Sequence, residues 1–174
     1  MSEVSQETGN TVRLTERRVF SESFKPLYAE GMALVERAAQ YLDGDGRLAA
    51  KSLSRPAATL YAAESMRLTT RLMQVASWLL LQRAANSGEM TRDQVAAEKA
   101  KVRLDTPSAH QDTLGWDELP GEFRALVDQS LRLQTRVRRM DEEVYGVAAA
   151  PAASRRTNPV SDQISLLRTA FGSG

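Results

Sequence analysis

The chain has 174 residues, enough for one domain with a single sizeable hydrophobic core. Its formal net charge is +1 and charges of both signs are interleaved, which argues against a dedicated binder of nucleic acid or anionic membranes. It has no cysteine and a single histidine, His110, so disulfides and thiol chemistry are excluded and most routes to a zinc site or imidazole catalysis are removed.

The N-terminal stretch, residues 1–18, is polar and shows no hydrophobic period. We therefore expect a flexible arm there, and neither a signal peptide nor an anchor. No apolar run in the sequence is long enough to span a membrane. These features together predict a cytoplasmic protein.

Helical periodicity begins at Phe20, from which apolar residues recur in steps of four and three. Ser23 is the expected N-cap, which would place Pro26 in the first turn, where its missing N–H costs little. Gly31 lies on the apolar row and indicates close approach by another helix. The sequence DGDG at 43–46 lacks the glycine and glutamate positions of a calcium loop, so we interpret it as a helix stop and turn.

The next segment, residues 54–86, is predicted to form the central helix, with Ser54 as N-cap and Pro56 in the first turn. It carries two apolar rows that start one residue apart and so lie about 100° apart around the helix. The first row consists of Tyr61, Ser65, Leu68, Leu72, Val75 and Leu79. The second row consists of Ala62, Met66, Thr69, Met73, Ala76 and Leu80.

Two apolar rows indicate that the central helix lies between two partners, because packing on a single neighbour requires only one row. The partners are either two helices of its own bundle, or one of these together with another subunit. A row left free by the bundle should be buried in a two-fold homodimer interface. Our candidates for that interface are Met66, Met73 and Leu80, with Phe24 and Tyr28 as the alternative.

A short helix is expected to open at Thr91, since Gln94 three residues later completes a capping-box pattern. It contains few large apolar residues, so we expect it to be peripheral. A long loop, residues 105–118, follows it, and Trp116 is expected to pin this loop to the body of the domain. His110 lies in the loop and is expected to be exposed to solvent.

The last long helix is predicted to start near Pro120. Its apolar row, spaced 4-3-4-3-4-3-4, consists of Leu119, Phe123, Leu126, Ser130, Leu133, Val137, Met140 and Val144. Arg132, Arg136 and Arg139 share a neighbouring face. That face is interpreted either as a solvated and partly self-paired surface or as a docking site for an acidic partner.

The C-terminal part, residues 147–174, is first rich in Ala, Pro and Ser and reads as a linker. A short amphipathic pattern then returns, with Ile164, Leu166, Leu167 and Phe171 as its apolar positions. Such a segment in a disordered tail is typical of a helix-in-groove ligand, and these four residues are predicted to bind a partner. The alternative is that the segment folds back on its own bundle.

These elements predict an all-α protein, namely a three-helix bundle with a long central helix, a short peripheral helix and flexible tails. The predicted boundaries are 1–18 for the arm, 19–146 for the bundle and 147–174 for the tail. The sequence contains no glycine-rich phosphate loop, no HExxH and no GxSxG motif. We therefore predict no catalytic, cofactor-binding or metal-binding residues, and a function in binding rather than as an enzyme.

Three long stretches also carry a likeness to a known family: SFKPLYAEGMALVERAAQYLDGDGR, RPAATLYAAESMRLTTRLMQVASWLLLQRA and GEMTRDQVAAEKAKVRL. Over essentially its whole length the chain resembles the regulators of CtrA degradation, an alphaproteobacterial family of ClpXP protease adaptors. The resemblance implies a dimeric three-helix bundle with a disordered C-terminal tail. It also implies that the protein joins ClpXP primed by a single-domain response regulator. Cargo, namely cell-cycle regulators including CtrA, would be delivered directly or through a cyclic-di-GMP-binding adaptor, with recruitment to a cell pole alongside the protease.

Other classes of function remain as alternatives. A helical enzyme would require a buried polar pocket. A helical DNA-binding protein would have to use Arg132, Arg136, Arg138 and Arg139, and its DNA binding would depend steeply on salt. A general protein-interaction module would have no role in proteolysis.

Overall fold

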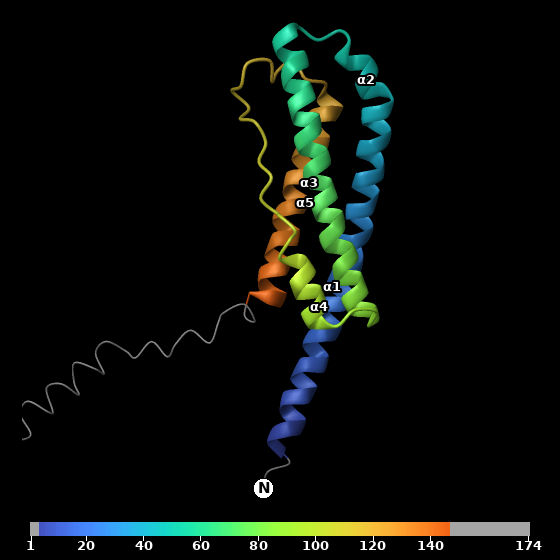
Figure 1. The fold of residues 1–174 in the computed structure, drawn as a ribbon, viewed down its shortest axis with the longest axis vertical. Coiled ribbons are helices and arrows are strands. Elements are labelled where there is room, and N and C mark those ends of the chain that lie inside the picture. Colours follow the sequence, from blue (N-terminus) through green and yellow to red (C-terminus); the bar gives the residue numbers. More distant parts are fainter. Residues whose placement is uncertain (1–3, 147–174) are drawn as a thin grey trace, which may run out of the picture. The chain divides into compact units, whose positions relative to one another are not determined.

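The computed structural model describes residues 4–146, with side chains from residue 21 onward. Five helices follow one another along this part of the chain (Figure 1): α1 (Val4–Asp43), α2 (Asp45–Ala50), α3 (Arg55–Ser87), α4 (Arg92–Lys99) and α5 (Gly121–Tyr145). Within residues 4–146 there is no β-strand, and the predicted all-α class is confirmed. No described helix combines the length and the apolar character needed to cross a membrane.

The core lies where α1, α3 and the part of α5 up to Arg138 pack together. The first apolar row of α3 supplies its centre: Leu68, Leu72, Val75 and Leu79 are almost fully buried. The Tyr61 ring of α3 contacts the Phe123 ring of α5, with their centroids 4.5 Å apart. A Cβ at Gly31 of α1 would lie 2.4 Å from Cδ1 of Leu79, which confirms the predicted close approach of another helix at this glycine.

The start of α1 differs from the prediction. The helix begins at Val4, so the predicted N-cap at Ser23 is wrong and Pro26 lies inside the helix. Pro26 is exposed, so the carbonyl group that loses its helical hydrogen bond there can be hydrated instead. Residues 4–18, expected to form a flexible arm, are helical, and the flexibility of the arm stays a prediction.

The predicted helix stop after residue 43 is correct, but the short helix α2 that follows was not foreseen. Gly46 in α2 is buried against two tyrosines. A Cβ there would lie 2.5 Å from the Tyr61 hydroxyl and 2.8 Å from the main-chain carbonyl of Tyr41. Glycine is therefore required for α2 to fold against the ends of α1 and α3.

The predicted N-caps of α3 and α4 are confirmed. The Ser54 hydroxyl accepts the hydrogen bond of the Ala57 N–H at the start of α3. Thr91 and Gln94 form both hydrogen bonds of a capping box at the start of α4. Helix α4 is peripheral, as expected, because Val95 and Lys99 are the only buried residues among its eight.

Candidate interaction surfaces and the buried polar cluster

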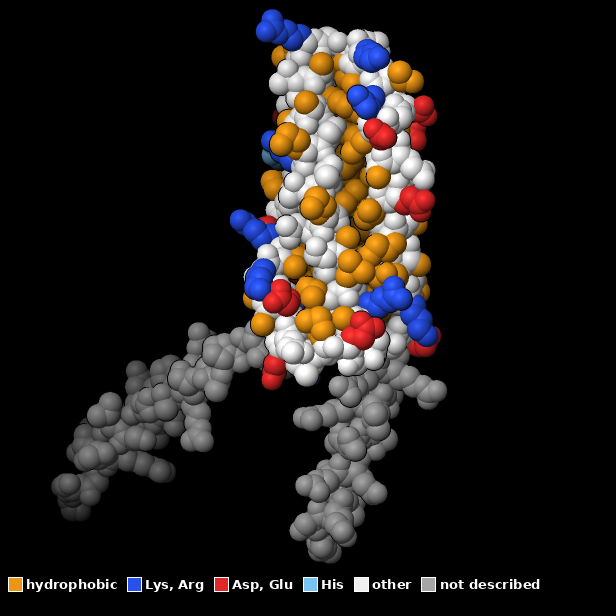
Figure 2. Space-filling view, turned by 45° about the vertical axis from the view of Figure 1, so that its right-hand side comes forward, with side chains coloured by type: hydrophobic (Ala, Val, Ile, Leu, Met, Phe, Trp, Pro, Cys, Tyr) orange, Lys and Arg blue, Asp and Glu red, His pale blue; other side chains and the backbone are white. Residues whose placement is uncertain are grey.

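The second apolar row of α3, which we call the outer row, is free in the monomer. Met66, Met73 and Leu80 expose 72%, 64% and 51% of their surface. Figure 2 shows apolar side chains spread along one face of the bundle. The two rows of the central helix thus differ, because one forms the core and the other leaves large apolar groups in solvent.

The alternative pair of interface candidates takes part in the packing of the monomer. Phe24 is buried, and its ring lies 6.4 Å from the Trp78 ring. Tyr28 is half-buried, and its hydroxyl accepts a hydrogen bond of 2.8 Å from Arg83. Burial in a second interface is therefore a role better suited to the outer row.

The arginines of α5 are engaged mostly within the chain. Arg132 pairs with Asp128 one turn earlier, and Arg136 pairs with Glu30 of α1. Both pairs are exposed to solvent, as is Arg139. These contacts agree with the interpretation of a solvated, partly self-paired face. Docking of an acidic partner at this face stays a prediction.

The predicted partner-binding residues of the tail lie outside the described residues. They are Ile164, Leu166, Leu167 and Phe171.

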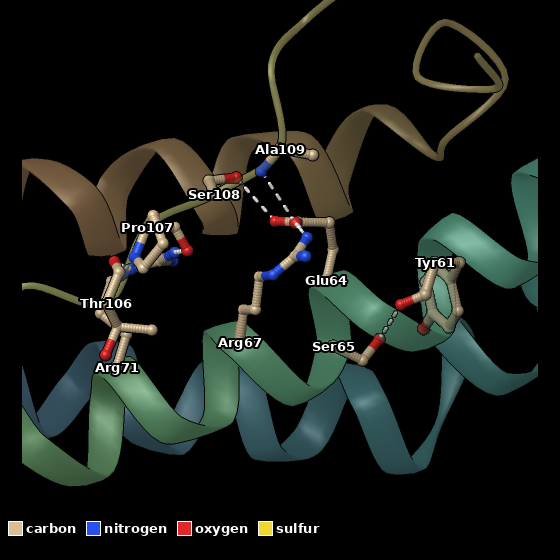
Figure 3. A network of polar contacts seen from close by, with 9 residues as sticks. All are labelled: Tyr61, Glu64, Ser65, Arg67, Arg71, Thr106, Pro107, Ser108 and Ala109. Carbon is tan, nitrogen blue, oxygen red and sulfur yellow. Dashed lines mark hydrogen bonds and ion pairs between the residues drawn. The ribbon is translucent and has the colours of Figure 1, made fainter. Parts of the chain in front are cut away.

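A buried polar cluster lies beneath the long loop (Figure 3), and it was not predicted from the sequence. Glu64 of α3 has no exposed surface. Its carboxylate accepts hydrogen bonds from the Ser108 hydroxyl at 2.6 Å and the Ala109 N–H at 2.9 Å, and it pairs with Arg67. Burial alone would raise the pKa of Glu64, but these hydrogen bonds and the charge of Arg67 together hold it below its usual value.

Arg71, also fully buried, donates to the loop from the same helix. Its Nε donates to the Thr106 carbonyl at 3.2 Å, and its Nη2 donates to the Pro107 carbonyl at 2.9 Å. Its Nη1 donates to the Ser130 hydroxyl of α5 at 2.7 Å. A buried guanidinium is tolerable only when its donors are satisfied in this way.

Two glutamines extend this pattern along the loop. Gln134 of α5 accepts from the Thr106 N–H at 3.2 Å and donates to the Thr106 carbonyl at 3.3 Å. Gln74 of α3 accepts from the Arg103 N–H at 2.9 Å. The loop is therefore bound to both helices through its main chain.

A third row on α3 could have revealed this cluster. Glu64, Leu68, Arg71, Val75, Trp78 and Gln82 are spaced by fours and threes, and all are buried. The row was not recognised as buried because it contains Glu64 and Arg71, and charged residues on a helix are usually exposed to solvent. Three of the partners of Glu64 and Arg71 are main-chain groups of the loop, at residues 106, 107 and 109, and such groups leave no pattern in side-chain identity.

The other predictions for the loop are confirmed. Trp116 is buried, so it pins the loop to the body, and His110 is exposed. Gly115 has a positive φ of 89°, and a Cβ there would lie 2.8 Å from the Ala57 Cα. Among the described residues, no group of three or more His, Cys, Asp or Glu could hold a metal ion.

Comparison with known proteins places the chain in a family. A family model described as "Protein of unknown function (DUF1465)" matches residues 15–171. No curated protein sequence matches significantly. Among solved structures, the crystal structure of RcdA from Caulobacter crescentus CB15 is similar, with 47% sequence identity and a TM-score of 0.59. The match covers 71% of this chain and 91% of that chain. The chain therefore belongs to the RcdA family, which confirms the resemblance found in its sequence.

Proposed function

We propose that this protein is a non-enzymatic adaptor of regulated proteolysis. It would join ClpXP primed by a single-domain response regulator and deliver cell-cycle regulators, CtrA among them, directly or through a cyclic-di-GMP-binding adaptor. Its place of work would be the cytoplasm, with recruitment to a cell pole alongside the protease. The observation that carries this proposal is the 47% identity with RcdA over 91% of that chain.

The arrangement of the polar groups supports a binding role over a catalytic one. Glu64 and Arg71 have the buried position of catalytic residues, but their hydrogen bonds go to the loop main chain and to Ser108 and Ser130. Groups engaged in this way hold the fold and do not face a substrate. The pairing of Arg132 and Arg136 with acidic residues also weighs against the DNA-binding alternative.

We propose further that the protein works as a homodimer joined through the outer row. Met66, Met73 and Leu80 are each seven residues apart, which spaces the three side chains over about 21 Å of one helix face. A two-fold axis would pair this face with the same face of a second copy. Methionine side chains adapt readily to such a contact.

The adaptor role can be tested by capture on immobilised ClpX. We expect the purified full-length protein to be retained when the priming response regulator is present and to pass through when it is absent. Serum albumin serves as a control for nonspecific retention. Equal retention with and without the regulator, or none in either case, would contradict the proposed mode of recruitment.

A further inference from the structure

Residues 103–109, which lead into the long loop and form its first part, are called the strap. They run beside α3 and α5 without helix or strand (Figure 1). The hydrogen bonds of the strap to these helices are made with four side chains, which we call the seam residues: Glu64, Arg71, Gln74 and Gln134. Glu64 and Arg71 are fully buried and Gln134 is nearly so. The seam is thus a built polar surface, and a segment of the same chain occupies it.

The seam residues recognise the main chain of the strap. Gln134 binds both the N–H and the carbonyl of Thr106, as a neighbouring β-strand does with one residue. Arg71 binds two successive carbonyls, and Gln74 and Glu64 each accept one N–H. One further hydrogen bond, from the Ser108 hydroxyl to Glu64, uses a side chain of the strap. Every non-proline residue of a peptide offers these main-chain groups.

The apolar contacts that hold the loop lie at its two ends. Leu104 and Trp116 are buried. Every side chain from residue 105 to residue 115 is exposed or half-buried. Segments with few buried apolar contacts are the ones that open locally while the rest of a protein stays folded. Opening would uncover Glu64 and Arg71, whose charges then need water or another main chain as partners.

We propose that the seam is a binding site for an extended peptide segment of a partner protein, and that the strap is its resident occupant. The partner segment would replace the strap and bind the same four side chains through its own N–H and carbonyl groups. Because the strap is tethered, it competes at a high effective concentration, so only a partner held by further contacts would displace it.

The first experiment weakens the hold of the strap on the seam. The double-proline variant, a full-length protein with Thr106→Pro and Ala109→Pro, lacks the two N–H groups that Gln134 and Glu64 accept. A synthetic peptide with the sequence of residues 105–110 is added to it. We expect the peptide to bind and to shift the NMR signals of the Arg71 and Gln134 side chains. A peptide N-methylated at the position of Thr106 loses a donor and should bind ~10-fold more weakly or worse.

Two variants separate the seam from its surroundings. In the double-proline background, Gln134→Ala should weaken binding of the peptide, while Thr135→Ala, at an exposed neighbouring position, should leave it unchanged. A scrambled peptide that keeps the proline in place should bind nearly as well, because the seam contacts main-chain atoms. A folded double-proline variant that binds no peptide at millimolar concentration would overturn the proposal.

A second measurement uses the unaltered protein and keeps the proposal testable if the double-proline variant fails to fold. Hydrogen exchange should show the amides of Thr106 and Ala109 exchanging at least ~100-fold faster than those of Leu72 and Val75 in α3. Equal rates would mean that the strap leaves only when the whole domain unfolds, and the proposal would then be wrong.

Discussion

At the scale of single residues, α3 places a carboxylate and a guanidinium in the interior and satisfies both from one loop. Glu64 and Arg71 are two turns apart on the same helix, and both are fully buried. The loop supplies donors to Glu64 and acceptors to Arg71 within four successive residues, from residue 106 to residue 109. Removing one member therefore leaves a buried partner unsatisfied, which costs more than the net worth of the hydrogen bond itself.

The substitution Glu64→Gln tests this account. It should lower the free energy of unfolding at neutral pH by about 1–3 kcal/mol, because the Ala109 N–H and Arg67 lose a charged acceptor. Glu36→Gln on the exposed side of α1 is the matched control and should change stability by less than about 0.5 kcal/mol. Urea denaturation followed by circular dichroism measures both.

The difference in unfolding free energy between wild type and Glu64→Gln should also depend on pH. The charged groups that face Glu64 are Arg67 and Arg71, and the pKa of Glu64 lies below its usual value in the folded state. The stability that its charge contributes is therefore present above the unfolded-state pKa, about 4.3, and is lost as the pH falls through the folded-state pKa. The difference between wild type and Glu64→Gln should shrink in acid. A difference that is constant from neutral to acid pH would show that the charge is not responsible.

At the scale of elements, regular patterns were predictable and contacts between distant segments were not. The capping box of Thr91 and Gln94 and the two rows of α3 follow from local spacing, so the sequence reveals them. Helix α2, with six residues, is too short to show a period, and it depends on the fit of Gly46 against tyrosines of α1 and α3. The N-terminal extension of α1 was missed because Pro26 suggested a first turn.

The fit of α2 can be tested at its glycine. Gly46→Ala should destabilise the protein by about 1–3 kcal/mol, since the added methyl group meets the main-chain carbonyl of Tyr41 and cannot be relieved by a rotamer change. Gly121→Ala at the start of α5 is the control, because a Cβ there has open space. Thermal unfolding of the two variants should differ clearly. Equal melting temperatures would mean that α2 does not pack as described.

At the scale of the whole molecule, the division of α3 into a buried and an exposed row links fold to assembly. The double substitution Met66→Lys with Met73→Lys should leave the monomer folded, because both side chains are exposed in it. In the proposed dimer it should weaken self-association at least ~100-fold, since each buried apolar side chain contributes about 1.5–3 kcal/mol.

Sedimentation at micromolar protein measures this effect. Leu114→Lys, which changes an apolar residue that is 77% exposed outside the outer row, should sediment like wild type. If the wild-type protein sediments as a monomer, the proposed dimer does not exist. If the double lysine variant still sediments as a dimer, the interface lies elsewhere.

The tail is predicted from sequence alone. Leu167→Ala with Phe171→Ala should leave the melting temperature unchanged and slow the degradation of at least one cargo. The reason is that the apolar residues of the predicted amphipathic segment are expected to bind a partner protein and not to stabilise the bundle. Delivery of every cargo at the wild-type rate would reduce the tail to a spacer.

The most direct test of the adaptor function is a reconstituted degradation assay with purified ClpXP, the priming response regulator and a panel of substrates. We predict that the protein alone hydrolyses nothing and that, with the regulator present, it accelerates the degradation of a subset of the panel, CtrA included once its cyclic-di-GMP-binding adaptor is added. Faster degradation of every substrate alike, or of none, would contradict this account.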